Sequence, residues 1–238
     1  MCTGVKIKPE GGSIMKQALK GLFAIILIGG IVLGATASET RSATKAPEDN
    51  VIISEDILIV FVDEPQHHYM RAFENFLKHD WEAAAAEIRK GAAFLKLEAS
   101  RAAGDAKKEL TASVQMLEKL ADDIEKGAVR SAKDVQDVFA KAEHAVAKHH
   151  YLKAAEAWGK KSIKKAGHEL QAAAVSLEHG FAWAGQKLDA GAVKAMDDTR
   201  HVAGKLLEGA GWVADEVGKA IEYLGRKIDM LGKTVAGS

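Results

Sequence analysis

The sequence has almost no cysteine. Cys2 is the single cysteine among 238 residues, and it lies ahead of a segment that we expect to be removed on export. The expected mature chain therefore has no thiol. This excludes disulfides, thiol catalysis, cysteine-ligated zinc and covalently attached c-type haem.

Proline is nearly as rare, and its distribution predicts the fold class. The three prolines are Pro9, Pro47 and Pro65, so residues 66–238 contain none. The same stretch is rich in alanine, lysine, glutamate and leucine, which are the residues with the highest helix propensity. Long helices joined by short turns fit this composition. We therefore predict an all-α fold, an antiparallel helical bundle with its first helix near Gln66.

The chain also lacks a strong excess of either charge. Four lysines and one glutamate lie in residues 1–37, so 29 of the 33 basic and 32 of the 33 acidic residues remain after that segment is removed. The mature chain would have a net charge of −3, with both signs interspersed. Such a surface has no electrostatic attraction for nucleic acid or for an anionic membrane. We expect no nucleic-acid partner, and membrane contact only through the N-terminal segment.

Residues 1–37 have the pattern of a secretory signal peptide. From Met15 the chain has two lysines, an apolar run over residues 22–33, and then the small residues Ala35 and Ala37. These are the basic, apolar and cleavage regions of a signal peptide, and they indicate that translation starts at Met15. The predicted location is the periplasm or the exterior after cleavage behind Ala37. The alternative is an uncleaved N-terminal membrane anchor, although the run is shorter than the roughly 20 residues that span a bilayer.

Residues 38–65 are expected to form a flexible leader that ends in an extended segment. Residues 38–50 are polar and have no periodicity. Residues 51–62 contain two short β-branched runs, which favour extended structure. We expect this apolar segment to pack across the helices, or alternatively to pair with a second copy of the chain.

An internal similarity appears when the sequence is shifted by 82 residues. His67-His68-Tyr69 then aligns with His149-His150-Tyr151, and about ten of 34 consecutive positions are identical. Asp80 aligns with Ser162, and both residue types are common helix N-caps. The pattern predicts a duplicated helix-turn-helix unit, with a first helical unit over residues 66–148 and a second over 149–238.

The first hairpin also resembles a tetratricopeptide repeat. In residues 72–94, Ala72, Asp80, Trp81 and Ala84 occupy places comparable to the small residues and the turn of that family. The resemblance implies helical-hairpin packing and a possible role in peptide recognition. The period of 82 instead of 34 residues, the lack of a closing proline and the presence of only two copies depart from the family pattern.

The C-terminal region predicts one continuous helix with a coiled-coil seam. Apolar residues alternate in steps of four and three from Ala203 to Val235. A second register carries glycine at every seventh position, namely Gly204, Gly211, Gly218, Gly225 and Gly232. Such a stripe lets a partner helix approach closely. The expected partner is another helix of this chain, with a second protomer, another protein or lipid as alternatives.

The histidines suggest a metal site only as an alternative hypothesis. The His-His pairs at His67, His68, His149 and His150 would have to meet between helices, because no two histidines stand four residues apart. The sequence contains no nucleophile elbow and no phosphate-binding glycine loop. It therefore predicts no catalytic residues and no cofactor. We expect an exported, non-enzymatic protein with an interaction, scaffolding or chaperone-like role, the alternative being a periplasmic metal- or haem-binding protein.

Overall fold

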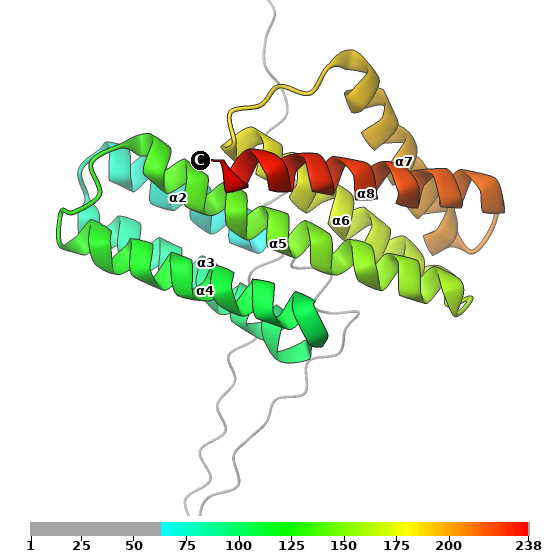
Figure 1. Cartoon of the computed structure of the whole chain (residues 1–238), viewed down its shortest axis with the longest axis horizontal. Coiled ribbons are helices and arrows are strands. Elements are labelled where there is room, and N and C mark those ends of the chain that lie inside the picture. The colour runs from blue at the N-terminus through cyan, green and yellow to red at the C-terminus, as the bar shows by residue number, and fades with distance from the viewer. Residues whose placement is uncertain (1–62, 238) are drawn as a thin grey trace, which may run out of the picture. The chain divides into compact units, whose positions relative to one another are not determined.

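A computed structural model describes residues 63–237, all of which lie in one compact unit. These residues form helices and turns and no strand, which confirms the predicted all-α bundle (Figure 1). The helices are α2 (Glu64–Leu77), α3 (Trp81–Arg101), α4 (Gly104–Glu125), α5 (Ala132–Gly159), α6 (Ile163–Trp183), α7 (Ala190–Glu208) and α8 (Ala214–Ala236). The predicted signal peptide, its start at Met15 and the extended segment at 51–62 lie outside the described residues. No helix within residues 63–237 is long and apolar enough to cross a membrane.

Local sequence signals place most helix ends. The Asp80 side chain accepts a hydrogen bond of 3.2 Å from the Ala83 backbone N–H, and Ser131 accepts one of 3.1 Å from Asp134. Both residues are N-caps, as predicted for Asp80, because their oxygens satisfy N–H groups that have no partner in the first helical turn. Ser162 is the N-cap residue of α6, but its side chain makes no such hydrogen bond.

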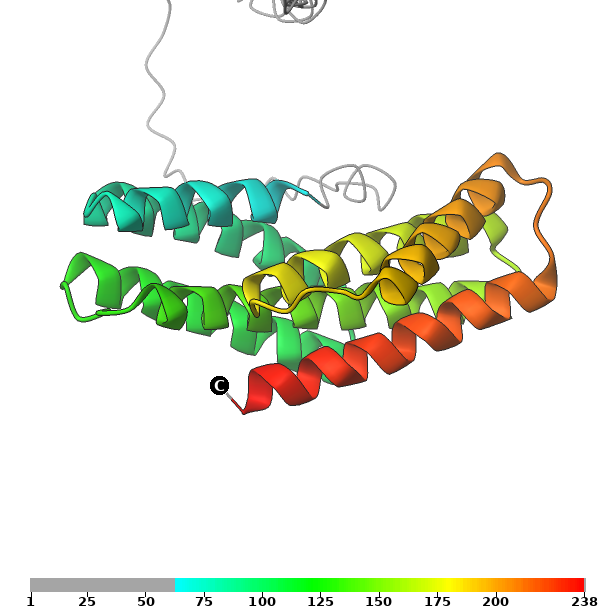
Figure 2. The ribbon, with the colours of Figure 1, turned by 90° about the horizontal axis from the view of Figure 1, so that it is seen from above.

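Two apolar cores lie along the bundle, and α5 belongs to both. The first core joins α2, α3 and α4 to the first half of α5, and includes Tyr69, Leu117 and Phe139. The second joins the rest of α5 to α6, α7 and α8. α5 is the longest of the described helices and packs against α2, α4, α6 and α8. In both ribbon views α8 runs beside α5, and α7 lies over α6 (Figure 2).

The predicted continuous helix from Ala203 to Val235 is wrong. α7 ends at Glu208, and a loop over residues 209–213 separates it from α8. Gly209 has a φ of 76°, and the Ala210 N–H donates to the Lys205 carbonyl at 3.2 Å, closing a Schellman motif. A left-handed glycine with this hydrogen bond ends a helix, whatever apolar pattern follows. The heptad seam is thus divided between two helices that pack on their own chain.

Positions 82 residues apart share the same local geometry. α3 and α6 both have 21 residues, and the turns before them contain the left-handed residues His79 (φ 62°) and Lys161 (φ 58°). The N-caps that follow have matching backbone angles, −87° and 79° at Asp80 and −82° and 74° at Ser162. The boundary placed between residues 148 and 149 falls inside α5, so one helix joins the two predicted units. The geometry agrees with a duplicated hairpin, whose common origin stays a prediction.

Candidate functional site

The histidines that the sequence singled out pair with carboxylates. His68 Nδ1 lies 2.7 Å from Glu87 Oε2, and His150 Nδ1 lies 2.7 Å from Glu169 Oε2. Both residues of one pair stand 82 positions from those of the other, so the same contact occurs twice. The two pairs differ in burial, since His68 and Glu87 are partly exposed whereas His150 and Glu169 are buried. Each contact fastens the first helix of a hairpin to the second.

The other histidine of each His-His pair, His67 or His149, differs from its counterpart in burial. His149 is buried, and its Nε2 lies 3.3 Å from Glu98 Oε2 of α3, whereas His67 is exposed. Burial alone would raise the pKa of Glu98, but the contact with His149 and the nearby His150 and Lys153 lower it overall. The pKa of Glu169 is lowered in the same way, against the effect of burial, by His150 and Lys153. Both carboxylates are therefore ionised at neutral pH, and they lie beside His149, His150 and Lys153.

The four histidines do not form a common metal site in the structure. Among residues 63–237, no group of three or more His, Cys, Asp or Glu side chains could hold a metal ion. The nitrogens at His68, His149 and His150 face carboxylates instead of one another. The alternative hypothesis of a metal or haem site gains no support from these contacts.

A second polar cluster lies inside the bundle, and sequence reasoning missed it. Glu143 of α5 is 3% exposed, and burial raises its pKa to about 8, an effect that Ser176 of α6 offsets only in part. His179 Nδ1 lies 3.9 Å from Glu143 Oε1. Burial, and then the proximity of Glu143, raises the pKa of Tyr69 of α2. At neutral pH Glu143 is therefore a protonated acid between three helices.

The polar atoms around Glu143 are poorly satisfied. Tyr69 Oη, Ser176 Oγ and His179 Nδ1 are buried, and none makes a well-formed hydrogen bond to a described residue. Burial lowers the pKa of His179, which favours its neutral form. The neutral His179 imidazole and the two hydroxyls carry no charge, so Glu143 can keep its proton beside them. The cluster lacks an ionised base beside Ser176, and we assign no nucleophilic role to that serine.

The predicted glycine stripe serves several different purposes. A methyl group added to Gly225 would lie 2.8 Å from Tyr151 Oη, and one added to Gly232 would lie 2.8 Å from His144 Nε2. These two glycines let α8 lie close against side chains of α5, as the intramolecular interpretation predicts. Gly204 and Gly218 have no described atom within 4 Å of such a methyl group, and Gly211 is a loop residue with a φ of 74°. The stripe as a surface for self-association stays a prediction.

A glycine outside that stripe lies close to the backbone of a neighbouring helix. A methyl group on Gly167 of α6 would lie 2.9 Å from the Ala203 carbonyl oxygen and 2.9 Å from Leu206 Cβ, both in α7. The absence of a side chain at Gly167 therefore sets how closely α7 packs on α6.

A groove lies between α7 and α8. It has a volume of about 480 Å³ and is lined only by residues of these two helices. The small or apolar residues Ala195, Val202 and Ala220 and the Tyr223 ring form its walls. Grooves of this size, between helices and with mainly apolar walls, are common ligand sites.

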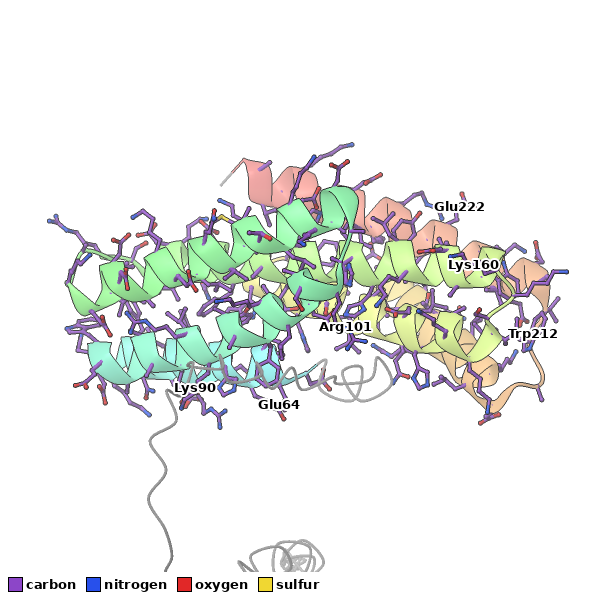
Figure 3. The ribbon with its side chains drawn as sticks, turned by 90° about the horizontal axis from the view of Figure 1, so that it is seen from below. Glu64, Lys90, Arg101, Lys160, Trp212 and Glu222 are labelled. Carbon is purple, nitrogen blue, oxygen red and sulfur yellow. The ribbon has the colours of Figure 1, made fainter. Side chains whose placement is uncertain are left out.

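Two contacts between α7 and α8 bound the groove. The Tyr223 hydroxyl donates to the Ala192 carbonyl at 3.0 Å, and Lys205 Nζ lies 3.0 Å from Glu216 Oε2. Beyond the second contact, the Trp212 ring packs edge-on against Trp158 of α5, with ring centroids 5.4 Å apart. Figure 3 shows Trp212 at the same end of the bundle as Lys160, which follows α5. The loop that joins α7 to α8 is thereby fixed to the bundle.

Charged side chains surround the apolar walls. Lys205, Lys219, Arg226 and His201 line the groove together with Asp198 and Glu216. The sequence pattern contained no sign of this groove, because the heptad steps from Ala203 onward predicted a single helix. No protein-family model, no curated protein and no solved structure matches this chain.

Proposed function

We propose that this protein is an exported, non-enzymatic binding protein of the cell envelope, with an interaction, scaffolding or chaperone-like role. The signal-peptide pattern of residues 1–37 supports export. The single observation that carries the binding role is the groove between α7 and α8. In this proposal the groove takes up an apolar group of a partner molecule.

The physical basis is the apolar area that the groove leaves in contact with water. The half-buried Ala195 and Tyr223 supply this area, and Val202 and Ala220 contribute less because they are largely buried. Covering such a surface with an apolar group is favourable by about 25 cal/mol for each Å² removed from water. Because Trp212 holds the α7–α8 loop against α5, the walls are in place before a ligand arrives. A preformed groove loses little conformational entropy on binding.

Binding of an uncharged apolar fluorophore tests this function. The full chain, expressed with its own N-terminal segment, is purified and titrated with N-phenyl-1-naphthylamine, whose emission rises in apolar surroundings. We expect saturable binding at one site per chain. The Ala195→Trp variant should lose this binding because the indole fills the groove.

A matched variant controls for the effect of a tryptophan on α7. Val193 is exposed, lies two residues away and does not line the groove. Val193→Trp should therefore bind the fluorophore as the natural sequence does. Equal binding by Ala195→Trp and Val193→Trp, or no saturable binding by the natural chain, would refute the proposed function.

A further inference from the structure

We infer that the ligand of the α7–α8 groove is an amphiphilic anion, a carboxylate with a hydrocarbon chain of medium length. This inference rests on the proposed function and names the chemical class that the same groove would bind. The size of the opening, the chemistry of its walls and the charges at its mouth each support it.

The opening is too short for a partner helix to lie along it. The contacts of Glu216 and Tyr223 with α7 bridge the groove at two points that are seven residues apart on α8. At 1.5 Å per residue, this span is about 10 Å along α8 and about 20 Å along α7, where Ala192 and Lys205 are 13 residues apart. A helix of several turns laid along the groove would meet one of these contacts on the α8 side. A narrow, flexible chain can enter from the solvent side and leave both contacts intact.

The walls suit a hydrocarbon chain. Three of the wall side chains, Ala195, Val202 and Ala220, are aliphatic and small, and they carry no hydrogen-bonding group. The Thr199 hydroxyl also lies in the lining, but it already donates to the Ala195 carbonyl at 2.8 Å. A ligand in this part of the groove therefore meets apolar surface and few unused donors. Each methylene group of a ligand that is buried there is removed from water, which favours binding.

The charges of the lining favour an anionic headgroup. Three lysine or arginine side chains and one histidine line the groove, against two carboxylates. Of these carboxylates, Glu216 is engaged by Lys205, and Asp198 by Lys194 at 2.8 Å. The cationic groups that remain at the mouth are on α8, at Lys219 and Arg226.

Lys219 and Arg226 can exchange their present partners for a ligand. Lys219 pairs with Asp215 at 2.6 Å, and Arg226 pairs with Glu222, both within α8. All four side chains are more than half exposed, and Asp215 and Glu222 do not line the groove. Exposed pairs of this kind contribute little free energy, so a ligand carboxylate can replace them at small cost. The arginine guanidinium also offers two parallel donors that match a carboxylate.

Displacement of the fluorophore by three ten-carbon amphiphiles tests the inference. Decanoate, decyltrimethylammonium and 1-decanol have the same chain and carry a negative, a positive and no charge. Each is added below the concentration at which it aggregates. We expect decanoate to displace N-phenyl-1-naphthylamine at about tenfold lower concentration than decyltrimethylammonium, the ratio for one charge-assisted hydrogen bond. Decanol should fall between them.

The Arg226→Glu variant should abolish or reverse this order. Its matched control is Lys233→Glu, which makes the same change of net charge on an exposed position of α8 outside the groove. That variant should keep the order of the natural chain. Both positions are exposed, so both variants should fold, as checked by circular dichroism.

The outcomes separate this inference from the function on which it rests. Equal displacement by the three amphiphiles would overturn the choice of an anion and leave the apolar groove standing. Equal weakening of decanoate binding by Arg226→Glu and Lys233→Glu would overturn that choice as well. Failure of the fluorophore to bind the natural chain would overturn both the inference and the proposed function.

Discussion

Replacing Glu143 by glutamine should stabilise the protein increasingly as the pH rises from 5 to 8. Burial raises the pKa of Glu143 from 4.5 to about 8, so the folded protein keeps a proton that the unfolded chain releases. Stability therefore falls with pH in this window, because the folded state binds more protons than the unfolded state. The loss begins near pH 4.5 and is complete once the pH has passed the folded pKa. Glutamine has nearly the same shape as the protonated acid and cannot ionise.

The size of the effect follows from the two pKa values. Proton linkage gives a loss of roughly 2 to 3 kcal/mol in the free energy of unfolding between pH 5 and pH 7. The glutamine variant should not show this part of the pH dependence. Burial lowers the pKa values of His144 and His179, and these groups act in the opposite direction, with stability gained as the pH rises. They are present in both chains, so the difference between the chains reports mainly on Glu143.

Urea unfolding followed by far-ultraviolet circular dichroism at pH 5, 6, 7 and 8 measures this difference. The control is Glu222→Gln, which removes an exposed carboxylate of α8 and should follow the natural chain at every pH. Parallel pH profiles for the natural chain and Glu143→Gln would refute the reasoning. A constant loss of stability in Glu143→Gln would also refute it, because it would mean that Glu143 acts as an ionised partner.

Three further predictions concern the helices and the N-terminus. Gly167→Ala should destabilise the protein by about 1 to 3 kcal/mol, because the new methyl group meets the α7 backbone. Gly218→Ala, at the corresponding fifth position of α8, should stabilise it by up to about 1 kcal/mol, and urea midpoints that move together would contradict both expectations. His150→Ala should cost about 1 to 3 kcal/mol of unfolding free energy because the buried Glu169 carboxylate then keeps only its contact with Lys153, whereas the partly exposed His68→Ala should cost clearly less; equal losses in the same titration would be inconsistent with the difference in burial. Edman sequencing of the exported protein should begin at Ser38, and a product that keeps the apolar run of residues 22–33 would favour the anchor alternative.

Features that depend on nearby residues were predictable from the sequence. Asp80 and Ser131 are N-caps because of residues within three positions of each. Composition alone sufficed for the all-α class. The 82-residue spacing matched His68 with His150, and the structure shows that His68 pairs with Glu87 and His150 with Glu169, which are also 82 residues apart.

Features that depend on the angle and order of packing were not predictable. Glu143 occurs in a stretch of alternating charged and small residues that is typical of a solvated face, and only the placement of α2 and α6 buries it. The break at Gly209 was hidden because the apolar residues of α7 and α8 continue one heptad register across it. Because the break was not predicted, neither the groove nor its two bounding contacts could be predicted. The close packing of α7 at Gly167 could not be predicted, because a single glycine in a helix does not by itself indicate a close contact.

The sharing of α5 between two cores has a consequence for the order of folding. Phe139, in the first half of α5, is fully buried among residues of α2, α3 and α4, so the hairpins that precede it lack part of their core until this helix is present. The second half of the same helix is covered only when α6, α7 and α8 have packed. We therefore expect a newly made chain to remain incompletely folded, and open to proteolysis, until its last helix docks. Equilibrium unfolding should then occur in a single cooperative transition, with both cores lost together.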